Sequence, residues 1–462
     1  MKNNVYYAGG AYPPFFVLEM EKVYLISLGC SKNKVDSEVI LGILLQDGFV
    51  PAANLEEAGV VIINTCAFIQ EAVEESIETI LEFVHKKEEG KINTLVVTGC
   101  LPQRYGEELS REIPEVDFWV GTGEFTQIPW LLKGGGPQIL VGTPSYLYDH
   151  TTPRVVTNTL HSAYVKIAEG CSHSCTFCLI PRLRGAYRSR VIDSVVREVE
   201  DLLDKGVVEI NLIAQDTTAY GRDLGEQKGL LRLLEKLIKI KAFMWIRILY
   251  AYPHPNNFPL PLLKLIAEEE KMCPYLDIPI QHINNKILRR MGRKTSEIEI
   301  RELIYRIREN YPNIHLRTTL MVGFPGEGEK EFSELVDFVN EVEFSHLGTF
   351  QYSPEEGTSA VRMKGKISSK VAEDRATQLM EMQQDIVWRK NREMVGSVIP
   401  VLIDRVCAGP RGFSQGRARF QAPEVDGMVY IDSGTANCGE IVEVKITEVG
   451  PYDLMAEIAG RS

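Results

Sequence analysis

EGCSHSCTFC, at residues 169–178, is the stretch of sequence on which the fold assignment rests. It places Cys171, Cys175 and Cys178 close together on a glycine-containing loop that follows the apolar segment 163–168. If this segment is the first strand of a β/α barrel, the loop lies at the carboxyl end of the strand, where such barrels bind ligands. Three thiolates can hold three irons of a [4Fe–4S] cluster and leave the fourth iron open to a small ligand.

A zinc site is the alternative interpretation of this loop. Cys175 and Cys178 have the spacing of half a zinc site, but a structural zinc ion takes four ligands. The chain contains no second close cysteine pair and no His-x-x-x-His motif. His173 could contribute a ligand, although we interpret it as a loop residue. The pattern therefore favours an iron–sulfur cluster.

Alternating strands and helices continue after this loop. Six β/α units predict an open or partial β/α barrel. We expect its strands at 163–168, 207–214, 244–250, 275–280, 314–321 and 346–352, with helices between them, for example at 194–204, 230–239 and 329–342.

An earlier β/α series precedes the barrel. Strands expected at 23–28, 59–64 and 93–98 alternate with helices expected at 33–47, 68–89 and 102–111. Alternation of this kind predicts a doubly wound parallel sheet. Glycine and proline then mark a linker at 141–156, so we expect an N-terminal domain over 21–140 and the barrel domain over 157–390. Residues 1–20 are interpreted as an extension.

One cysteine follows each strand of this N-terminal sheet. Cys30, Cys66 and Cys100 are far apart in sequence, but neighbouring parallel strands present their carboxyl ends on one edge of a sheet. The alternative is three buried core cysteines, which are common singly. Core cysteines would fall within the strands rather than just beyond them, which favours a second three-cysteine cluster site. Cys273, Cys407 and Cys438 show no such pattern and are interpreted as structural.

The pattern changes again near residue 395. Short alternating runs at 398–404, 416–420, 427–431, 440–449 and 453–458 are separated by glycine and proline. They predict a small five-stranded antiparallel β-barrel, OB-like in outline, over 391–462. Residues 393–462 carry ten Asp and Glu against six Lys and Arg, a balance that disfavours an RNA-binding barrel.

Composition limits the class of protein. The chain has 462 residues and a net charge of −12, which disfavours a general nucleic-acid or anionic-membrane binder. It contains no apolar stretch of membrane-spanning length and no signal peptide, so we expect a cytoplasmic protein without membrane contact. Nine cysteines in a reducing compartment do not indicate a disulfide framework.

The motifs together resemble a known family. The three-cysteine loop on a first barrel strand is similar to that of radical S-adenosylmethionine (SAM) enzymes. With the dispersed cysteines in front and the small barrel behind, the chain resembles the methylthiotransferases, and the small barrel resembles their TRAM domain. Segments 28–38, 180–185, 214–221 and 422–427 resemble the RimO type, which modifies an aspartate of a small-subunit ribosomal protein. Ser31, Lys34 and Ile283-Asn284 depart from that pattern.

The resemblance implies cofactors and residue roles. It implies two [4Fe–4S] clusters, one held by Cys30, Cys66 and Cys100 and one by Cys171, Cys175 and Cys178, with no catalytic residue beyond these ligands. SAM would serve both as radical source and as methyl donor. The SAM contacts implied by family position are Gln215, Asp216, Arg317, Gly323 and Gly326. Gln281 and His282 are further candidate polar residues lining the barrel.

The resemblance also implies a reaction and partners. It implies methylthiolation at Cβ of an aspartate of ribosomal protein S-12, free or in the ribosome, by a monomer. An electron donor such as flavodoxin or ferredoxin and a sulfur donor are implied as partners. The acidic small barrel suits a basic ribosomal protein better than RNA. Methylthiolation of a tRNA adenosine (the MiaB type) is the nearest alternative, and a non-catalytic iron–sulfur or zinc module that docks on ribosomes is a remote one.

A basic run follows the cysteine loop. Arg182, Arg184, Arg188 and Arg190 fall within a short segment. Such a run usually forms a solvated face. The sharper hypothesis is that it holds an anionic group, either SAM or the carboxylate of the substrate.

Overall fold

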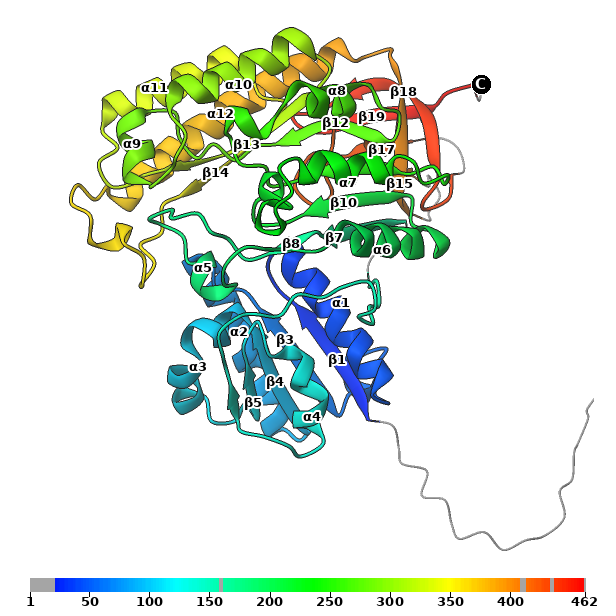
Figure 1. Cartoon of the computed structure of the whole chain (residues 1–462), viewed down its shortest axis with the longest axis vertical. Helices are drawn as coiled ribbons and strands as arrows, with labels where there is room; N and C mark the ends of the chain where they lie inside the picture. Colours follow the sequence, from blue (N-terminus) through cyan, green and yellow to red (C-terminus); the bar gives the residue numbers. More distant parts are fainter. Residues whose placement is uncertain (1–20, 158–160, 408–412, 433–435, 461–462) are drawn as a thin grey trace, which may run out of the picture.

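Three folded units follow one another along the chain. The structure is a computed structural model that describes residues 21–157, 161–407, 413–432 and 436–460. The extension expected at 1–20 lies outside the described residues. Figure 1 shows the N-terminal sheet in blue and cyan, the central barrel in green and yellow, and the C-terminal barrel in orange and red. No helix in the described ranges combines the length and the apolar character needed to cross a membrane.

The N-terminal unit is a six-stranded parallel sheet. Its spatial order is β2 (Val50–Pro51), β1 (Lys22–Ser27), β3 (Val60–Thr65), β4 (Thr94–Gly99), β5 (Phe118–Val120) and β6 (Ile139–Leu140). Apolar residues of α1 (Ser31–Gln46) and α4 (Ile128–Leu132) pack on one face, and those of α2 (Gln70–Glu88) and α3 (Cys100–Glu112) on the other. Every residue of β3 is buried, as expected for a parallel strand covered on both faces. The sheet is doubly wound, as the sequence predicts.

The central unit is an open barrel of six parallel strands. The strands are β7 (Ser162–Lys166), β10 (Glu209–Ile213), β11 (Trp245–Ile248), β12 (Met272–Asp277), β13 (His315–Val322) and β14 (His346–Gln351). All neighbouring pairs are parallel, and no pairing joins β14 to β7 among the described residues. Helices α6 (Ile192–Asp204), α7 (Gly229–Leu237), α8 (Leu260–Glu268), α10 (Glu297–Asn310), α11 (Glu329–Val342) and α12 (Ser369–Glu393) accompany the strands. The partial β/α barrel is therefore confirmed.

Two central elements differ from the expectation. The strand expected at 275–280 begins at Met272 and ends at Asp277, because the apolar run Ile278–Ile280 belongs to the following connection. Helix α12 was not expected from the sequence. Its buried stripe includes Arg375 and Gln383 beside Leu379 and Ile386, so it lacks a clean apolar periodicity.

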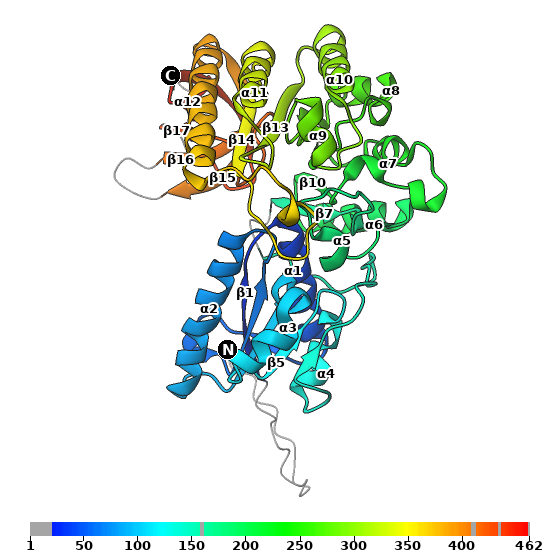
Figure 2. The same cartoon turned by 90° about the vertical axis from the view of Figure 1, so that its left-hand side faces the viewer.

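The C-terminal unit is a closed five-stranded barrel. Its strands are β15 (Val398–Cys407), β16 (Phe413–Ala418), β17 (Val429–Ile431), β18 (Ile441–Val449) and β19 (Leu454–Ile458). The closed small barrel is confirmed. One pair, β17 with β19, is parallel rather than antiparallel. Figure 2 shows this unit beside β14 and α12.

The C-terminal unit closes one end of the central barrel. Ala422 is fully buried in an apolar cluster with Trp245 and Tyr275. Asp426 accepts a hydrogen bond of 2.7 Å from the Tyr275 hydroxyl. Arg417 pairs with Glu209, the first residue of β10, at 2.8 Å. Glu209 and Trp245 start their strands, so the closed end is the amino-terminal one, and the carboxyl ends face the N-terminal unit.

Candidate active site

Three cysteines meet at the carboxyl edge of the N-terminal sheet. Cys30 immediately precedes α1, Cys66 directly follows β3, and Cys100 opens α3 directly after β4. Strands β1, β3 and β4 are parallel neighbours, so their ends share one edge. Burial, with smaller contributions from Cys100 and Cys30, raises the pKa of the Cys66 thiol to about 12. The three thiols are therefore close enough to influence one another.

Glycines allow the strand ends at this edge to approach closely. Gly29 has φ +85°, and a Cβ there would lie 2.6 Å from Cβ of Cys66. Gly99 has φ +99°, and a Cβ there would lie 2.4 Å from Oδ1 of Asn64 and 2.5 Å from the Thr65 carbonyl oxygen. Side chains cannot occupy such space without moving backbone. Each glycine directly precedes a cysteine, so the close approach places the thiols.

Two buried asparagines fix the same edge. Asn33 donates from Nδ2 to the carbonyl oxygens of Leu28 at 3.0 Å and Thr65 at 2.8 Å. Asn64 donates from Nδ2 to the Asn33 carbonyl oxygen and to Ser37 Oγ, both at 2.9 Å. These bonds satisfy buried polar groups of the loops and hold the trio's backbone in place.

The second cysteine trio lies at the mouth of the central barrel. Cys171, Cys175 and Cys178 lie between β8 (Ala168–Glu169) and α5 (Ile180–Leu183). Burial is the main cause that raises the pKa of the Cys171 thiol to about 11, and the charge of Cys175 adds to it. Nη1 of Arg293 lies 3.9 Å from Sγ of Cys175 and donates toward it.

Both trios suit clusters whose irons are bound one to each thiolate. All six cysteines are free thiols. Iron binding displaces the proton of a buried thiol and compensates the charge of the thiolate. Among the described residues, no three His, Cys, Asp or Glu side chains converge as ligands of a single ion. A four-iron cluster instead requires three thiols around a larger space, one for each of three irons.

A buried ion network joins the two trios. Arg184 donates from Nη1 to Oδ2 of Asp36 at 2.5 Å, and its Nη2 lies 3.7 Å from Sγ of Cys100. Lys166 pairs with the other oxygen of Asp36 at 2.5 Å and also with Glu169. Glu169 stands two residues before Cys171 and accepts the Gly170 backbone N–H at 3.1 Å. The network thus runs from the sheet edge to the cysteine loop of the barrel.

Of the basic run after the cysteine loop, Arg182 is exposed, but the other three arginines do not form a solvated face. Arg184 and Arg190 are buried, and each pairs with a carboxylate of the protein, Asp36 and Glu198 respectively. Arg188 donates to backbone carbonyl oxygens, including that of Ala186. The alternative that Arg184 holds a cofactor or substrate anion is not supported, because Asp36 occupies its guanidinium.

Unpartnered polar atoms gather at the carboxyl ends of the barrel strands. Oε1 of Gln215, Oδ1 of Asp277 and Oε1 of Gln281 are buried and form no hydrogen bond within the described part of the chain. Nε of Arg317, the third residue of β13, also forms no hydrogen bond there, but it lies 3.3 Å from Oδ1 of Asp426. Burying such atoms without a partner costs free energy. SAM carries amino, carboxylate and ribose groups that could satisfy them. The atoms at the carboxyl ends therefore fit SAM, and Gln215 and Gln281 are members that the sequence indicated. Arg317, by contrast, has its guanidinium paired with a carboxylate of the protein.

The other expected SAM contacts have protein partners. Oδ1 of Asp216 accepts from the backbone N–H of Thr218 at 2.9 Å, and its Oδ2 lies 2.7 Å from Nε2 of His173. Gly323 has φ +74°, and a Cβ there would lie 2.5 Å from Cβ of Ala372 in α12. Gly326 has φ +92°, and a Cβ there would meet Nε of Arg290 at 2.9 Å. Packing within the protein already requires both glycines.

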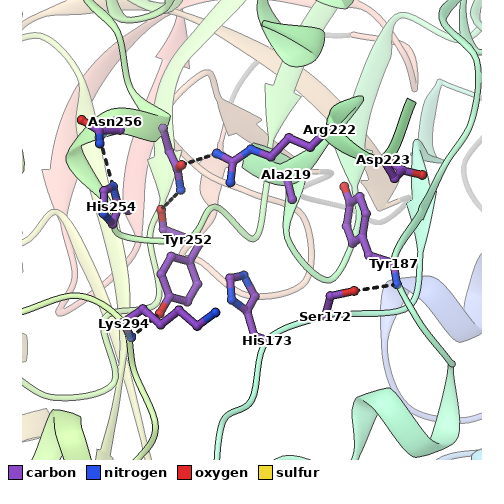
Figure 3. A pocket seen from close by; sticks show the side chains of 11 residues that line it. Ser172, His173, Tyr187, Ala219, Arg222, Asp223, Tyr252, His254, Asn256 and Lys294 are labelled. Atoms are coloured by element: carbon purple, nitrogen blue, oxygen red, sulfur yellow. Dashed lines mark hydrogen bonds between the residues drawn. The ribbon is translucent and has the colours of Figure 1, made fainter. Parts of the chain in front are cut away.

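A cavity of about 590 Å³ lies beside the cysteine loop (Figure 3). Ser172 and His173 line it from the loop, and Tyr252 lines it from the connection after β11. The rings of His173 and Tyr252 stack with their centroids 4.1 Å apart. Because Asp216 binds His173, it helps to hold this wall of the cavity in place. The volume is that of a small-molecule site.

Several residues in and around the central barrel were not indicated by the sequence. Tyr250 has φ +62°, and its hydroxyl lies 3.2 Å from Oγ of Ser31 in α1. Asp277 accepts the Tyr250 backbone N–H at 2.9 Å. Asp426, from the C-terminal unit, lies 3.3 Å from Nε of Arg317. Each belongs to a contact between distant segments, which leaves no local pattern in the sequence.

Three family models match the chain in succession. The Uncharacterized protein family UPF0004 matches residues 22–121, the Radical SAM superfamily matches 165–339, and the TRAM domain matches 395–459. The first match contains Cys30, Cys66 and Cys100, and the second contains the three cysteines of the barrel loop.

Curated relatives match almost the whole chain. The ribosomal protein uS12 methylthiotransferase RimO of Syntrophotalea carbinolica is 47% identical over 96% of this chain and 98% of its own length. That of Geobacter sulfurreducens is 46% identical over 95% of this chain and 98% of its own length. That of Myxococcus xanthus is 44% identical over 96% of this chain and 92% of its own length.

Solved structures share the fold at low sequence identity. The radical SAM methyltransferase TsrM of Kitasatospora setae, with cobalamin and a [4Fe–4S] cluster bound, matches with a TM-score of 0.51 and 16% identity, over 72% of this chain and 75% of that chain. The cobalamin-dependent SAM radical enzyme OxsB matches with a TM-score of 0.52 and 14% identity, over 80% of this chain and 56% of that chain. These likenesses support the fold.

Proposed function

Because this chain belongs to the radical-SAM methylthiotransferase family, we propose that it methylthiolates an aspartate of the small-subunit ribosomal protein S-12 (uS12) at Cβ. The near full-length relatives are uS12 methylthiotransferases by name. The acidic balance of residues 393–462 suits a basic ribosomal protein as partner.

The observation that carries the proposal is the pair of cysteine trios. One trio lies at the edge of the N-terminal sheet and the other at the barrel mouth, and Arg184 connects their surroundings. A radical generator needs one open-iron cluster, whereas sulfur insertion also needs a source of sulfur. Two separate three-thiol sites on facing units meet both requirements.

We assign the ligands of the two clusters accordingly. Cys171, Cys175 and Cys178 would hold the barrel cluster, and Cys30, Cys66 and Cys100 would hold the N-terminal one. When bound, the barrel cluster would supply the electron that cleaves SAM, and the N-terminal cluster would supply sulfur and take up the electron released when the C–S bond forms. The hydrogen atom of the C–H bond would leave in 5′-deoxyadenosine, and a second SAM would give the methyl group and leave as S-adenosylhomocysteine.

The chain's own residues position these reactants. Gln215 offers an unpartnered polar atom to SAM at the barrel mouth. Arg317, whose guanidinium is paired with Asp426, is assigned as a SAM contact by its position in the family. Asp216, Gly323 and Gly326 are assigned as further SAM contacts by their position in the family motifs. The buried Lys166–Glu169 pair holds the start of the cysteine loop, because Glu169 binds both Gln215 and the Gly170 backbone. The pair therefore fixes the position of the cysteine loop relative to the side chain of Gln215.

The wider assignment follows from the same family. We propose an N-terminal methylthiotransferase domain over 21–140, a linker over 141–156, a radical-SAM domain over 157–390 and a TRAM domain over 391–462. The enzyme would act in the cytoplasm as a monomer, with an electron donor such as flavodoxin or ferredoxin and a separate sulfur donor.

Label transfer tests the substrate. Anaerobically reconstituted protein is incubated with reductant, a sulfur source and methyl-labelled SAM, together with purified uS12 and with unmodified tRNA in parallel. We expect label in uS12 and none in tRNA. Label in tRNA without label in uS12 would overturn the substrate assignment in favour of the adenosine-modifying type.

Iron content tests the alternative of a non-catalytic module. Two four-iron clusters give about eight irons per chain. We expect that content together with 5′-deoxyadenosine formation from SAM. Bound zinc with no SAM cleavage would contradict an enzymatic role.

A further inference from the structure

Lys32 is a largely buried lysine whose ammonium group has no acidic partner among the described residues. It lies in the first turn of α1 and is 8% exposed. None of the hydrogen bonds and ion pairs found among the described residues includes its Nζ. That atom lies over the face of the Tyr250 ring, whose centroid is 2.8 Å away. A buried cation is ordinarily paired with an anion, so the position of Lys32 indicates a ligand.

The neighbouring buried cations show the ordinary arrangement. Lys166 pairs with Asp36 and Glu169, and Arg184 pairs with Asp36. Arg154 binds Glu38 and Glu198. Lys32 stands on the same helix as Asp36 and Glu38, yet both of these carboxylates are bound to other cations. Among these described cations, Lys32 is therefore the one without a carboxylate partner.

The place of Lys32 is defined from two sides. Ser31, its neighbour, lies 3.2 Å from the Tyr250 hydroxyl, so the start of α1 touches the barrel mouth directly. Cys30, a proposed ligand of the N-terminal cluster, is two residues before Lys32. The ammonium group therefore lies where the sheet edge with its cysteines meets the carboxyl ends of β11 and β12.

Other charged groups near Lys32 have contacts within the protein, although Oδ1 of Asp277 has no hydrogen-bond partner among the described residues. Asp277 accepts the backbone N–H of Tyr250 at 2.9 Å and lies 4.0 Å from Nη1 of Arg317. Arg317 also pairs with Asp426 at 3.3 Å. Asp277 is near enough for the charge of Lys32 to influence it but forms no ion pair with it. Lys32 is accordingly the uncommitted cation of this group.

The reaction places an anion at this position. The carbon that receives sulfur, Cβ of an aspartate, is bonded directly to the side-chain carboxyl carbon. That carbon must come near the N-terminal trio, so its carboxylate comes within reach of a cation two residues from Cys30. The barrel trio, with one iron open to a small ligand, is the proposed site of SAM, which leaves Lys32 to the substrate.

We propose that Lys32 binds the carboxylate of the target aspartate and makes the enzyme select aspartate over its neutral isostere asparagine. This inference rests on the proposed function and deepens it by naming a specificity-determining residue. Tyr250 holds the ammonium in place through its ring, and the buried setting strengthens the ion pair over one in water.

Binding measurements on the reconstituted enzyme test this role without relying on turnover. The ligands are purified uS12 and a uS12 variant in which the target aspartate is replaced by asparagine. We expect the unaltered enzyme to bind the asparagine variant about tenfold more weakly, the loss of one close charge pair. Lys32→Gln should bind both ligands within twofold of each other. Lys32→Arg should restore most of the preference.

Lys34→Gln is the matched control, because it removes the same charge from the same helix. Lys34 is paired with Glu424 at 2.5 Å, and its variant should keep the preference for aspartate. Lys32→Gln enzyme that still prefers aspartate tenfold would refute the role of Lys32. Equal binding of both uS12 forms by the unaltered enzyme would refute it as well, without any enzyme variant. Failure of the unaltered enzyme to methylthiolate uS12 would instead refute the proposed function.

Discussion

For single residues at the two cysteine trios, the sequence predicts the place of some in the site but not of others. Cys30, Cys66 and Cys100 could be assigned because each follows a parallel strand at the same phase, and strand order then brings them together. Arg184 could not be assigned, because its partner Asp36 is 148 residues away and on another folded unit. The sequence pattern shows which residues share an edge, but not which side chain of a second unit reaches that edge.

Replacement of Arg184 by Met tests the link between the trios. The variant keeps much of the long side chain but leaves Asp36 and Glu169 with Lys166 as their remaining cation. We expect the free energy of unfolding to fall by about 3–5 kcal/mol, the usual cost of breaking a buried ion pair on one side. Urea unfolding followed by circular dichroism measures it. Arg188→Met, which removes hydrogen bonds to backbone carbonyls only, should cost clearly less, and equal losses would contradict a special role for Arg184.

At the scale of helices and strands, the sequence predicts most of what positions the site. Helix α11, expected at 329–342, has those bounds, since its apolar stripe follows the helical period cleanly. Strand β12 begins and ends earlier than expected, because apolar residues continue past its end. Helix α12 was not expected, because polar residues interrupt its buried stripe. The turns before Cys30 and Cys100 depend on glycines with positive φ. The Gly-Cys pairs in the sequence suggest such turns but do not give their conformation.

Substitution of Gly99 by Ala tests the close approach of β3 and β4. A Cβ there would lie 2.4 Å from Asn64 Oδ1, and φ is +99°. We expect reconstituted protein to contain about four irons fewer, because the N-terminal trio is displaced while the barrel trio is not. Gly48→Ala is the matched control: its φ is +94°, but no atom lies within 4 Å of the added Cβ. If both variants keep a full iron content, the approach of the strands does not place the trio.

At the scale of the whole molecule, the C-terminal unit is part of the barrel rather than an appendage. Glu209 of β10 binds Arg417 of the C-terminal unit and Arg247 of β11. Although burial opposes it, the charges of Arg417 and Arg247 hold the pKa of Glu209 well below its usual range. The sequence predicts a small acidic barrel, but its insertion at the barrel end depends on these buried pairs, which have no local signature.

Replacement of Arg417 by Met tests this attachment. It leaves Glu209 and Asp404 without the guanidinium that binds both, so we expect a loss of about 3–5 kcal/mol and easier proteolysis between the two units. Limited proteolysis and urea unfolding measure these effects. Arg405→Met, on the neighbouring strand β15 and exposed, should change neither. Resistance to protease equal to that of the unaltered protein would contradict the attachment.

The ion pair between Glu209 and Arg417 predicts that the stability of the protein depends on pH. The folded-state pKa of Glu209 is lowered, so its contribution is complete above the unfolded-state value of about 4.3 and is lost as pH falls below it. We expect the stability of the unaltered protein to decline more steeply below that pH than that of Arg417→Met. Parallel pH curves for the two proteins would contradict the assignment.

Mass spectrometry of uS12 tests the central claim most directly. The protein is isolated from cells that lack this enzyme, from cells that carry it, and from cells that carry Cys66→Ala. We predict a methylthio group in place of one hydrogen on a single aspartate, present only with the unaltered enzyme. Unmodified uS12 in cells with the unaltered enzyme, or a methylthio group that persists with Cys66→Ala, would contradict the claim that two cysteine trios carry out methylthiolation of this ribosomal protein.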